Sequence, residues 1–225
     1  PLTKLPFVKE CNPFDDLTNS IRSKVWIYGI RQPYRWNFHP TTDELFIGEV
    51  GWDTWESIKK GIRGKNYGWP CYEGNLPQPH YTAQFSQCAA LPSSAVTFPI
   101  VTWAHTDASP SLPGYNPSFL GDAAIGGPIY TGTAYPQLYS GNYFFADYVT
   151  GFLRRLVFDA SGNVTSNIVF GTGLNGIVSL EQGPDGRLYY IHFPTGEIRR
   201  IKFNGPVAKA TAVPTSGYSP LTVTF

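Results

Sequence analysis

The segment Thr150-Gly151-Phe152-Leu153-Arg154-Arg155-Leu156 recurs later in the chain as Thr195-Gly196-Glu197-Ile198-Arg199-Arg200-Ile201. An aromatic run precedes each copy, Tyr143-Phe144-Phe145 before the first and Leu188-Tyr189-Tyr190 before the second. The corresponding glycines, Gly151 and Gly196, are 45 residues apart, a spacing typical of four-stranded propeller blades. The repeat therefore predicts an all-β chain in which successive sheets follow one another as blades. A duplicated hairpin in another all-β fold is the alternative.

The composition favours short strands separated by turns. The 225 residues include 23 Gly and 20 Pro, which are scattered without a period. These two residue types destabilise a helix interior by about 1 and about 3 kcal/mol, respectively. One short helix is predicted at residues 55–61, where Gly61 is placed to end it. Further strands are predicted at residues 25–28, 44–47, 128–130, 143–145, 152–158, 187–191 and 197–203.

The charge balance excludes several classes of function. Seventeen Lys and Arg against 16 Asp and Glu give a net charge of +1, so no strong field attracts the chain to nucleic acid or to an anionic membrane. No apolar run approaches the roughly 18 residues that a membrane-spanning helix needs. We therefore expect neither a nucleic-acid partner nor a membrane span.

The cysteine pattern indicates the cellular compartment in which the protein occurs. Cys11, Cys71 and Cys88 form no C-x-x-C pair, which disfavours a thiolate zinc site. A disulfide between Cys71 and Cys88 would close a loop of moderate length and stabilise the chain by about 3 kcal/mol; two free thiols are the alternative. Cys11 would then stay free or pair outside the chain. With the glycosylation sequon Asn163-Val164-Thr165, these features favour a secreted protein, extracellular or periplasmic.

The chain divides into two unequal parts. Residues 1–204 carry the strand-and-turn pattern, interrupted at residues 72–120 by a long Pro- and Ser-rich stretch of the kind that forms functional loops. Residues 205–225 read as a linker followed by alternating Ala and a Pro-x-x-Gly-x-x-Pro-Leu-x-Val-x-Phe pattern. This pattern resembles the first strands of an immunoglobulin-like PKD module, which we expect to be truncated here. The N-terminus lacks Met, and we expect the first part to be the C-terminal portion of a longer domain.

Several ordered motifs resemble those of the glucose/sorbosone dehydrogenase family. They are Gly29-Ile30-Arg31-Gln32-Pro33, the strand ending at Glu49-Val50-Gly51, and Asn66-Tyr67-Gly68-Trp69-Pro70, followed by Ile125 to Tyr130, Phe144 to Tyr148 and Gly183-Pro184-Asp185-Gly186. Family members show Gly-x-Arg-Asn-Pro, Asp-Val-Gly, Trp-Glu-Glu-Ile and Asn-Tyr-Gly-Trp-Pro in this order. The resemblance covers about residues 12 to 203.

The resemblance implies a six-bladed β-propeller that holds pyrroloquinoline quinone (PQQ) and a calcium ion at one mouth. The implied reaction is hydride transfer from a sugar or polyol to the quinone, with electrons passed to an acceptor that the sequence does not identify. Arg31 and Gln32 match the cofactor-contacting pair. Gly51 and Trp52 fall where backbone carbonyls ligate calcium, a hard ion that prefers oxygen. The proton-accepting histidine of the family lies upstream of Pro1, so no catalytic residue is assigned within this chain.

Three departures from the family pattern leave a second function open. Gln32 replaces the usual Asn, residues 146–150 lack the Lys found in cofactor-binding members, and residues 176–181 lack their Arg residues. Each charged hydrogen bond lost to the cofactor's carboxylates would cost about 1.5–3 kcal/mol. The alternative is a non-catalytic propeller that binds carbohydrate or protein.

Other polar residues are secondary candidates. His105 either reaches the mouth or is a capped surface residue, whereas His39, His80 and His192 are expected to be structural. The adjacent arginines at 154–155 and 199–200 point to opposite faces of their strands, so neither pair can clamp one anion. Asp147 and Asp185 are expected at a strand end and a hairpin turn.

Overall fold

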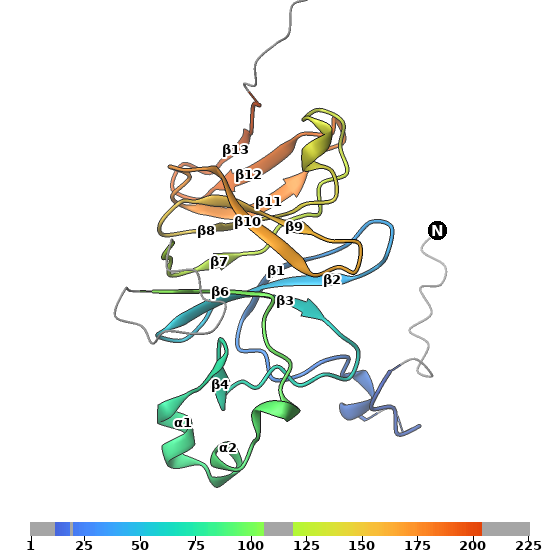
Figure 1. Ribbon diagram of the computed structural model, residues 1–225, viewed down its shortest axis with the longest axis vertical. Helices are drawn as coiled ribbons and strands as arrows, with labels where there is room; N and C mark the ends of the chain where they lie inside the picture. Colours follow the sequence, from blue (N-terminus) through green and yellow to red (C-terminus); the bar gives the residue numbers. More distant parts are fainter. Residues whose placement is uncertain (1–11, 19, 106–118, 204–225) are drawn as a thin grey trace, which may run out of the picture.

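The computed structural model describes residues 12–18, 20–105 and 119–203, which form three antiparallel sheets stacked one on another (Figure 1). The described part of the chain is all-β apart from short helices. The first sheet has the order β1-β2-β3-β6, the second β10-β9-β8-β7, and the third β11-β12-β13. The strands are β1 (Pro33–Phe38), β2 (Leu45–Glu49), β3 (Trp55–Gly61), β6 (Val101–Ala104), β7 (Ala124–Ile125), β8 (Tyr143–Asp147), β9 (Leu153–Phe158), β10 (Val164–Gly171), β11 (Ile177–Gln182), β12 (Leu188–His192) and β13 (Glu197–Arg200).

The sequence repeat forms two equivalent hairpins. The first copy joins β8 to β9 and the second joins β12 to β13. Gly151 and Gly196 both have φ of 68°, a left-handed conformation that glycine adopts without the penalty other residues incur. The prediction of strand pairs in successive sheets is therefore confirmed.

The predicted helix at residues 55–61 is wrong, because these residues form β3 in the middle of the first sheet. Trp55 to Gly61 pair with β2 on one side and β6 on the other. The segment has no apolar/polar alternation because polar residues on both faces are buried: Glu56 on one, Ser57 and Lys59 on the other. Ladder hydrogen bonds to two neighbouring strands outweigh the helix-like composition.

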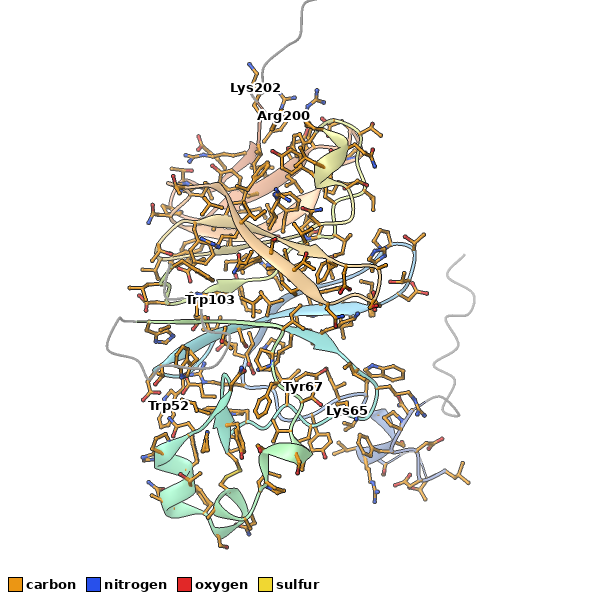
Figure 2. All side chains as sticks on the ribbon, viewed as in Figure 1. Trp52, Lys65, Tyr67, Trp103, Arg200 and Lys202 are labelled. Atoms are coloured by element: carbon orange, nitrogen blue, oxygen red, sulfur yellow. A yellow bond between two sulfur atoms is a disulfide. The ribbon has the colours of Figure 1, made fainter. Side chains whose placement is uncertain are left out.

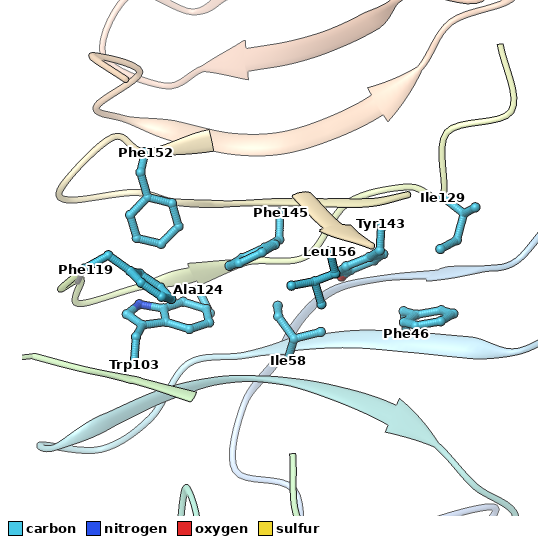
Figure 3. Close-up of a cluster of buried hydrophobic side chains, with 10 residues drawn as sticks. All are labelled: Phe46, Ile58, Trp103, Phe119, Ala124, Ile129, Tyr143, Phe145, Phe152 and Leu156. Atoms are coloured by element: carbon cyan, nitrogen blue, oxygen red, sulfur yellow. The ribbon is translucent and has the colours of Figure 1, made fainter. Parts of the chain in front are cut away.

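Two layers of apolar side chains hold the sheets together. Phe46 and Ile58 of the first sheet pack against Tyr143 and Leu156 of the second, with Trp103 at one end of the layer (Figure 3). A second layer joins the second and third sheets through Ile125, Phe144, Leu153, Leu180 and Leu188, each at most 1% exposed. The strands predicted at residues 25–28 and 128–130 form just one isolated bridge each within the described residues, Tyr28 with Asn66 and Ile129 with Tyr143.

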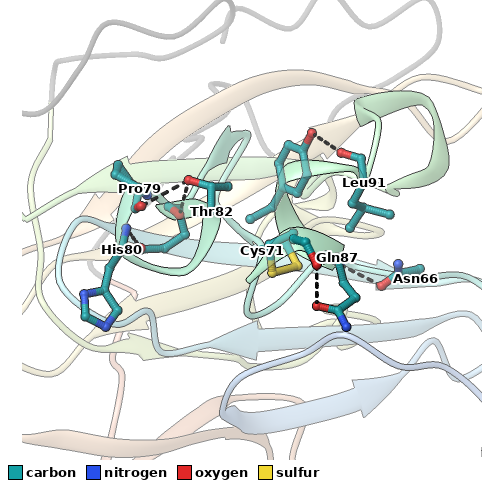
Figure 4. Close-up of a disulfide and its surroundings, with 12 residues drawn as sticks. Asn66, Cys71, Pro79, His80, Thr82, Gln87 and Leu91 are labelled. Carbon is teal, nitrogen blue, oxygen red and sulfur yellow. Dashed lines mark hydrogen bonds between the residues drawn. A yellow bond between two sulfur atoms is a disulfide. The ribbon is translucent and has the colours of Figure 1, made fainter. Parts of the chain in front are cut away.

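A small subdomain projects from the first sheet. It contains β4 (Tyr72–Glu73), β5 (Leu76–Pro77), α1 (Pro79–Gln84) and α2 (Ser86–Ala89). The Cys71–Cys88 disulfide ties its start to α2, which confirms the predicted bridge (Figure 4). Three single-turn helices occur elsewhere, η2 (Arg22–Lys24), η3 (Ser93–Ala95) and η4 (Gln137–Tyr139).

Several predictions lie outside the described residues, namely the PKD-like start within residues 205–225 and the state of Cys11. The last predicted strand, residues 197–203, is shorter than expected, because β13 ends at Arg200. Among the described residues, no helix has the length and apolar character needed to cross a membrane.

Candidate functional site

A cleft of about 540 Å³ lies where the three sheets meet. One strand of each sheet reaches it: β1 through Tyr34 and Arg35, β7 through Ile125, and β11 through Val178. Gln32 and Ala123, which precede β1 and β7, and Val50, Tyr148 and Phe193, which follow β2, β8 and β12, close it at one end of the sheets, which we call the mouth. The full lining is Gln32, Tyr34, Arg35, Val50, Ala123, Ile125, Tyr148, Val178 and Phe193.

Gln32 lines this cleft, and Arg31 lies beside it. The Arg31 backbone N–H donates to Glu49 Oε1 at 2.7 Å, and its guanidinium Nη1 donates to the Val50 carbonyl at 3.2 Å. The guanidinium also lies 5.6 Å from the centre of the Trp69 ring, within cation–π range. The side chain is half-buried, so part of the guanidinium stays accessible. The structure thus brings the Arg31–Gln32 pair to the mouth.

Gly51 and Trp52 continue directly from Val50 of the cleft wall. A Cβ on Gly51 would lie 1.8 Å from the Trp55 carbonyl oxygen, so only glycine fits this turn. The φ of Gly51 is not left-handed, and close approach rather than conformational freedom explains the residue. Neither carbonyl oxygen, of Gly51 or of Trp52, accepts a hydrogen bond from any residue that the structure describes. Both oxygens therefore keep their acceptor capacity within the described residues, Gly51 being buried and Trp52 exposed.

The Glu73 carboxylate holds the turn that follows Gly51 in place. Its Oε1 accepts hydrogen bonds from the four successive backbone N–H groups of residues 52–55, at 2.9–3.1 Å. Burial on its own would raise the pKa of Glu73, but the four N–H bonds outweigh it and lower that pKa. Glu73 Oε2 is buried and accepts no hydrogen bond from the described residues. The turn that carries Gly51 and Trp52 is thus held by a buried carboxylate.

Glu56 ties the mouth end of the first sheet to the second. Its Oε1 accepts from Gly51 N–H at 3.0 Å and lies 2.8 Å from His105 Nε2, and its Oε2 accepts from Ala124 N–H of β7 at 2.6 Å. Burial raises the pKa of Glu56. Burial alone would lower the pKa of His105, but the bond and charge of Glu56 raise it. His105 is therefore bonded to a buried carboxylate at the mouth end.

A second buried ion pair lies on the other face of the first sheet. Lys59 contacts Glu49, and both are almost fully buried. Ser57 donates to Glu49 Oε2 at 3.0 Å. Desolvation lowers the pKa of Lys59 to about 7, although attraction to Glu73 opposes this shift. Because Glu49 also accepts the Arg31 backbone N–H, this pair supports the cofactor-contacting position that the resemblance implies.

Arg35 is a cleft residue that the sequence analysis missed. It sits in a β-bulge of β1 with φ of 61°, a left-handed conformation that is strained for a non-glycine residue. Its Nε donates to the Val178 carbonyl of β11 at 2.7 Å, across the cleft. No motif marks this position, because a bulge follows from strand register and leaves no compositional signal.

The opposite wall of the cleft is uncharged. Tyr148 follows β8, Val178 lies on β11, and Phe193 follows β12. Tyr148 and Val178 belong to the two segments, residues 146–150 and 176–181, that lack the Lys and Arg of the family pattern. The side chains that these segments contribute to the cleft lining are aromatic or aliphatic.

The remaining candidates have structural roles. Asp147 Oδ1 caps its own turn by accepting from the N–H groups of Val149 and Thr150 at 2.9 Å, and its Oδ2 accepts from Ala123 N–H at 3.0 Å and Trp103 Nε1 at 3.3 Å. Arg154 bonds Asn167 while Arg155 bonds Asn142, in opposite directions as expected. Asp185 and the other histidines likewise bond close to themselves in the chain: Asp185 to Arg187 and Tyr189, His39 to Thr41, His80 to Gln84 and His192 to Thr195. No cluster of three or more His, Cys, Asp or Glu side chains suited to a metal occurs in the described ranges.

The sequence matches the model of a known protein family over most of its length. The family model described as Glucose / Sorbosone dehydrogenase matches residues 6–200, which is most of the chain. The chain belongs to the glucose/sorbosone dehydrogenase family. Among curated relatives it is 30% identical to the HIPL2 protein of Arabidopsis thaliana over 164 residues, 70% of this chain and 22% of that protein. It is also 35% identical to the aldose sugar dehydrogenase YliI of Escherichia coli over 65 residues, 29% of this chain and 15% of that enzyme.

Solved structures share the fold. A glucose dehydrogenase superposes with a TM-score of 0.62 at 22% identity, covering 86% of this chain and 50% of its own. The PQQ-bound aldose sugar dehydrogenase of Streptomyces coelicolor gives a TM-score of 0.54 at 21% identity, covering 84% and 46%. The chain thus spans about a fifth of the first curated relatives and about half of these structures.

Proposed function

We propose that this chain is the C-terminal part of a six-bladed propeller in an exported, calcium- and PQQ-dependent oxidoreductase that acts on a sugar or polyol hydroxyl. The observation that carries the proposal is the gathering of Arg31, Gln32 and the Gly51–Trp52 turn around Val50 at the mouth of the cleft. On this proposal the three sheets are consecutive blades, residues 1–204 belong to the propeller, and residues 205–225 begin a PKD-like module. The Cys71–Cys88 disulfide supports export to an oxidising compartment.

The donor set of the turn fits calcium. The Gly51 and Trp52 carbonyl oxygens accept no hydrogen bond from described residues, and calcium binds such oxygens. Glu73 and Glu56 hold the N–H groups of the same turn, which leaves its carbonyls preorganised. The remaining ligands would come from the cofactor and water.

One side of the cleft fits an anionic quinone cofactor. Arg31 and Arg35 supply positive charge there, and the Gln32 amide can donate a hydrogen bond. When bound, PQQ would supply the acceptor for a hydride leaving the sugar carbon. The residues of this chain would bind and orient: Arg31 and Gln32 hold the polar edge, while Tyr148 and Phe193 exclude water from the opposite wall. The hydroxyl proton would pass to a residue outside this chain.

Reconstitution of the full-length protein with PQQ and calcium chloride tests this proposal. We expect aldose-dependent dye reduction, and we expect Arg31→Ala to weaken cofactor binding by about tenfold to a hundredfold, because one charged hydrogen bond is worth about 1.5–3 kcal/mol. The matched control is Arg187→Ala in the β11–β12 turn, where the arginine pairs with Asp185. Absence of cofactor binding at micromolar concentration would refute the oxidoreductase. The 225-residue chain alone is expected to be inactive.

The uncharged wall favours a second candidate. Tyr148, Val178 and Phe193 supply no charge of their own, so on that side Arg35, which reaches across to the Val178 carbonyl, is the one cation among the cleft-lining residues that the structure describes. A non-catalytic propeller that binds carbohydrate or protein in the cleft has no need of those charges. Sugar binding by the full-length protein that does not depend on PQQ, together with no dye reduction, would select this function.

A further inference from the structure

Five aromatic rings gather at the rim beside the mouth, and we call them the rim aromatic cluster. Trp52 lies at its centre, with ring centroids 5.1 Å from Tyr81, 5.2 Å from His80 and 6.0 Å from Trp69. Tyr81 lies 5.3 Å from Trp69 and 6.0 Å from Phe85, onto which it stacks. Trp52 is labelled in Figure 2 and His80 in Figure 4. The rings come from three separate segments of the first sheet and its subdomain.

Unlike a hydrophobic core, the rim aromatic cluster is partly exposed to solvent. Trp52 is 37% and Phe85 48% exposed, and the His80 side chain also faces solvent. Tyr81 and Trp69 are half-buried beneath them. Large aromatic side chains grouped at a surface favour a ligand that has apolar faces.

Three sets of interactions hold the segments of the rim aromatic cluster in place. The Glu73 carboxylate accepts the N–H of Trp52 and of the three residues after it. The Cys71–Cys88 disulfide joins the segment after Trp69 to α2. Gln78 caps α1 by accepting from His80 N–H at 2.8 Å. A platform fixed before binding loses little conformational entropy when a ligand arrives.

The cluster is continuous with the cleft. Trp52 is two residues from Val50 of the cleft wall, and the Arg31 guanidinium contacts both the Trp69 ring and the Val50 carbonyl. A ligand that enters the mouth can therefore extend over the rings.

The polar groups around the rings suit hydroxyls rather than charges. The Gln84 amide lies 2.9 Å from His80 Nε2 on α1, and the Gln78 amide lies 3.4 Å from Asp53 Oδ1. These amides, the imidazole and one carboxylate can exchange hydrogen bonds with sugar hydroxyls. Asp53 and the Arg31 guanidinium, which lies on the Trp69 ring, place opposite charges beside the cluster, so no net charge favours an ionic sugar and a neutral saccharide is the matching ligand.

We propose that the rim aromatic cluster is a carbohydrate subsite that stacks the second or third residue of a neutral oligosaccharide whose end lies in the mouth. A pyranose presents C–H groups on its faces and hydroxyls at its edge, which matches flat rings bordered by amides. The inference rests on the proposed sugar-directed mouth, and it assigns the preferred ligand as an oligosaccharide rather than a free monosaccharide.

Calorimetric titration of the full-length protein tests the subsite. The probes are glucose against cellotetraose, and mannose against mannotetraose. We expect one tetrasaccharide to bind about tenfold more tightly than its monosaccharide. Phe85→Ala and Trp52→Ala should each remove most of that gain. The matched control is Leu138→Ala, which removes an exposed apolar side chain from a turn at the opposite end of the second sheet and should keep the gain.

Two outcomes would overturn the inference. One is that neither tetrasaccharide binds more than twofold more tightly than its monosaccharide, as expected if the rings dock a peptide instead. The other is that Phe85→Ala and Trp52→Ala keep the gain while circular dichroism shows a folded protein. Dye reduction without a tetrasaccharide preference would reject the subsite and keep the oxidoreductase. A tetrasaccharide preference without PQQ binding would reject the oxidoreductase and keep the subsite.

Discussion

At the scale of single residues, the Glu56–His105 pair is the most consequential polar contact. Glu56 is fully buried, yet it bonds the Gly51 turn, the Ala124 N–H and the His105 ring, so one carboxylate fixes three segments. Losing a buried charged hydrogen bond costs about 1.5–3 kcal/mol, which is a large share of the stability of a typical domain.

We predict that His105→Gln lowers stability by about 1.5 kcal/mol at pH 6 and by much less at pH 9. The pKa of His105 is raised in the folded chain, so its contribution is complete below about pH 6.5 and is lost as the pH rises through the folded value. The raised pKa of Glu56 acts in the same direction. The lowered pKa of Lys59 acts oppositely, so only the difference between wild type and variant is informative.

Urea unfolding at both pH values measures this difference, and a double-mutant cycle supplies the control. In a Glu56→Gln background, the pH-dependent effect of His105→Gln should be much smaller, because only the weaker attraction of Asp122, 3.9 Å from His105 Nδ1, and of Glu73 remains. An equal loss at pH 6 and pH 9 in the wild-type background would contradict the prediction.

At the residue scale, a sequence motif marked some of the cleft positions, whereas positions that depend on geometry alone carried no signal; the cofactor-binding role of the marked residues stays a prediction. The Gly-x-Arg-x-Pro motif located Arg31 and Gln32 beside the cleft. Arg35 was missed because its bulge depends on the register of β1 against β2. The His105 contact was left open, because its partner lies 49 residues away in sequence and only the pairing of β3 with β6 brings them together.

At the scale of elements, turn chemistry was more informative than segment composition. The repeated Thr-Gly turn predicted two hairpins because a left-handed glycine is a local requirement. The β3 strand was predicted as a helix because its two faces bury Glu56 and Lys59, which removes the alternation that identifies a strand. Burial of those charges follows from ion pairs with distant residues, which a local pattern does not contain.

We predict that the two equivalent turn glycines differ in their tolerance of alanine. Gly151→Ala and Gly196→Ala both place a side chain at φ of 68°, which costs about 1–2 kcal/mol. A Cβ on Gly151 would lie 2.4 Å from the Asn175 backbone nitrogen, whereas a Cβ on Gly196 meets nothing within 4 Å. Gly151→Ala should therefore cost about 1–3 kcal/mol more than Gly196→Ala in chemical denaturation. Equal losses would show that the turn 148–151 relaxes away from Asn175.

At the scale of the whole molecule, both outer sheets carry apolar side chains on their open faces. Trp36 and Phe38 on β1 are 57% and 53% exposed. At the other end of the stack, Ile198 of β13 is 74% exposed and pairs with Ile191 of β12, also exposed. These faces resemble the buried faces between the sheets, where Phe46 and Leu188 pack. A propeller with further blades would cover both faces.

We predict that Ile198→Lys improves the behaviour of the 225-residue chain produced alone but destabilises the full-length protein. In the 225-residue chain produced alone, Ile198→Lys should reduce self-association, because it places a charge on an exposed apolar face. In the full-length protein the same change should lower the unfolding midpoint, because a neighbouring blade would bury the lysine without a partner. Sedimentation velocity measures the first effect and thermal unfolding the second, with Leu138→Lys in an exposed turn as the control. If Ile198→Lys left the full-length protein as stable as Leu138→Lys does, the third sheet would not pack against a further blade.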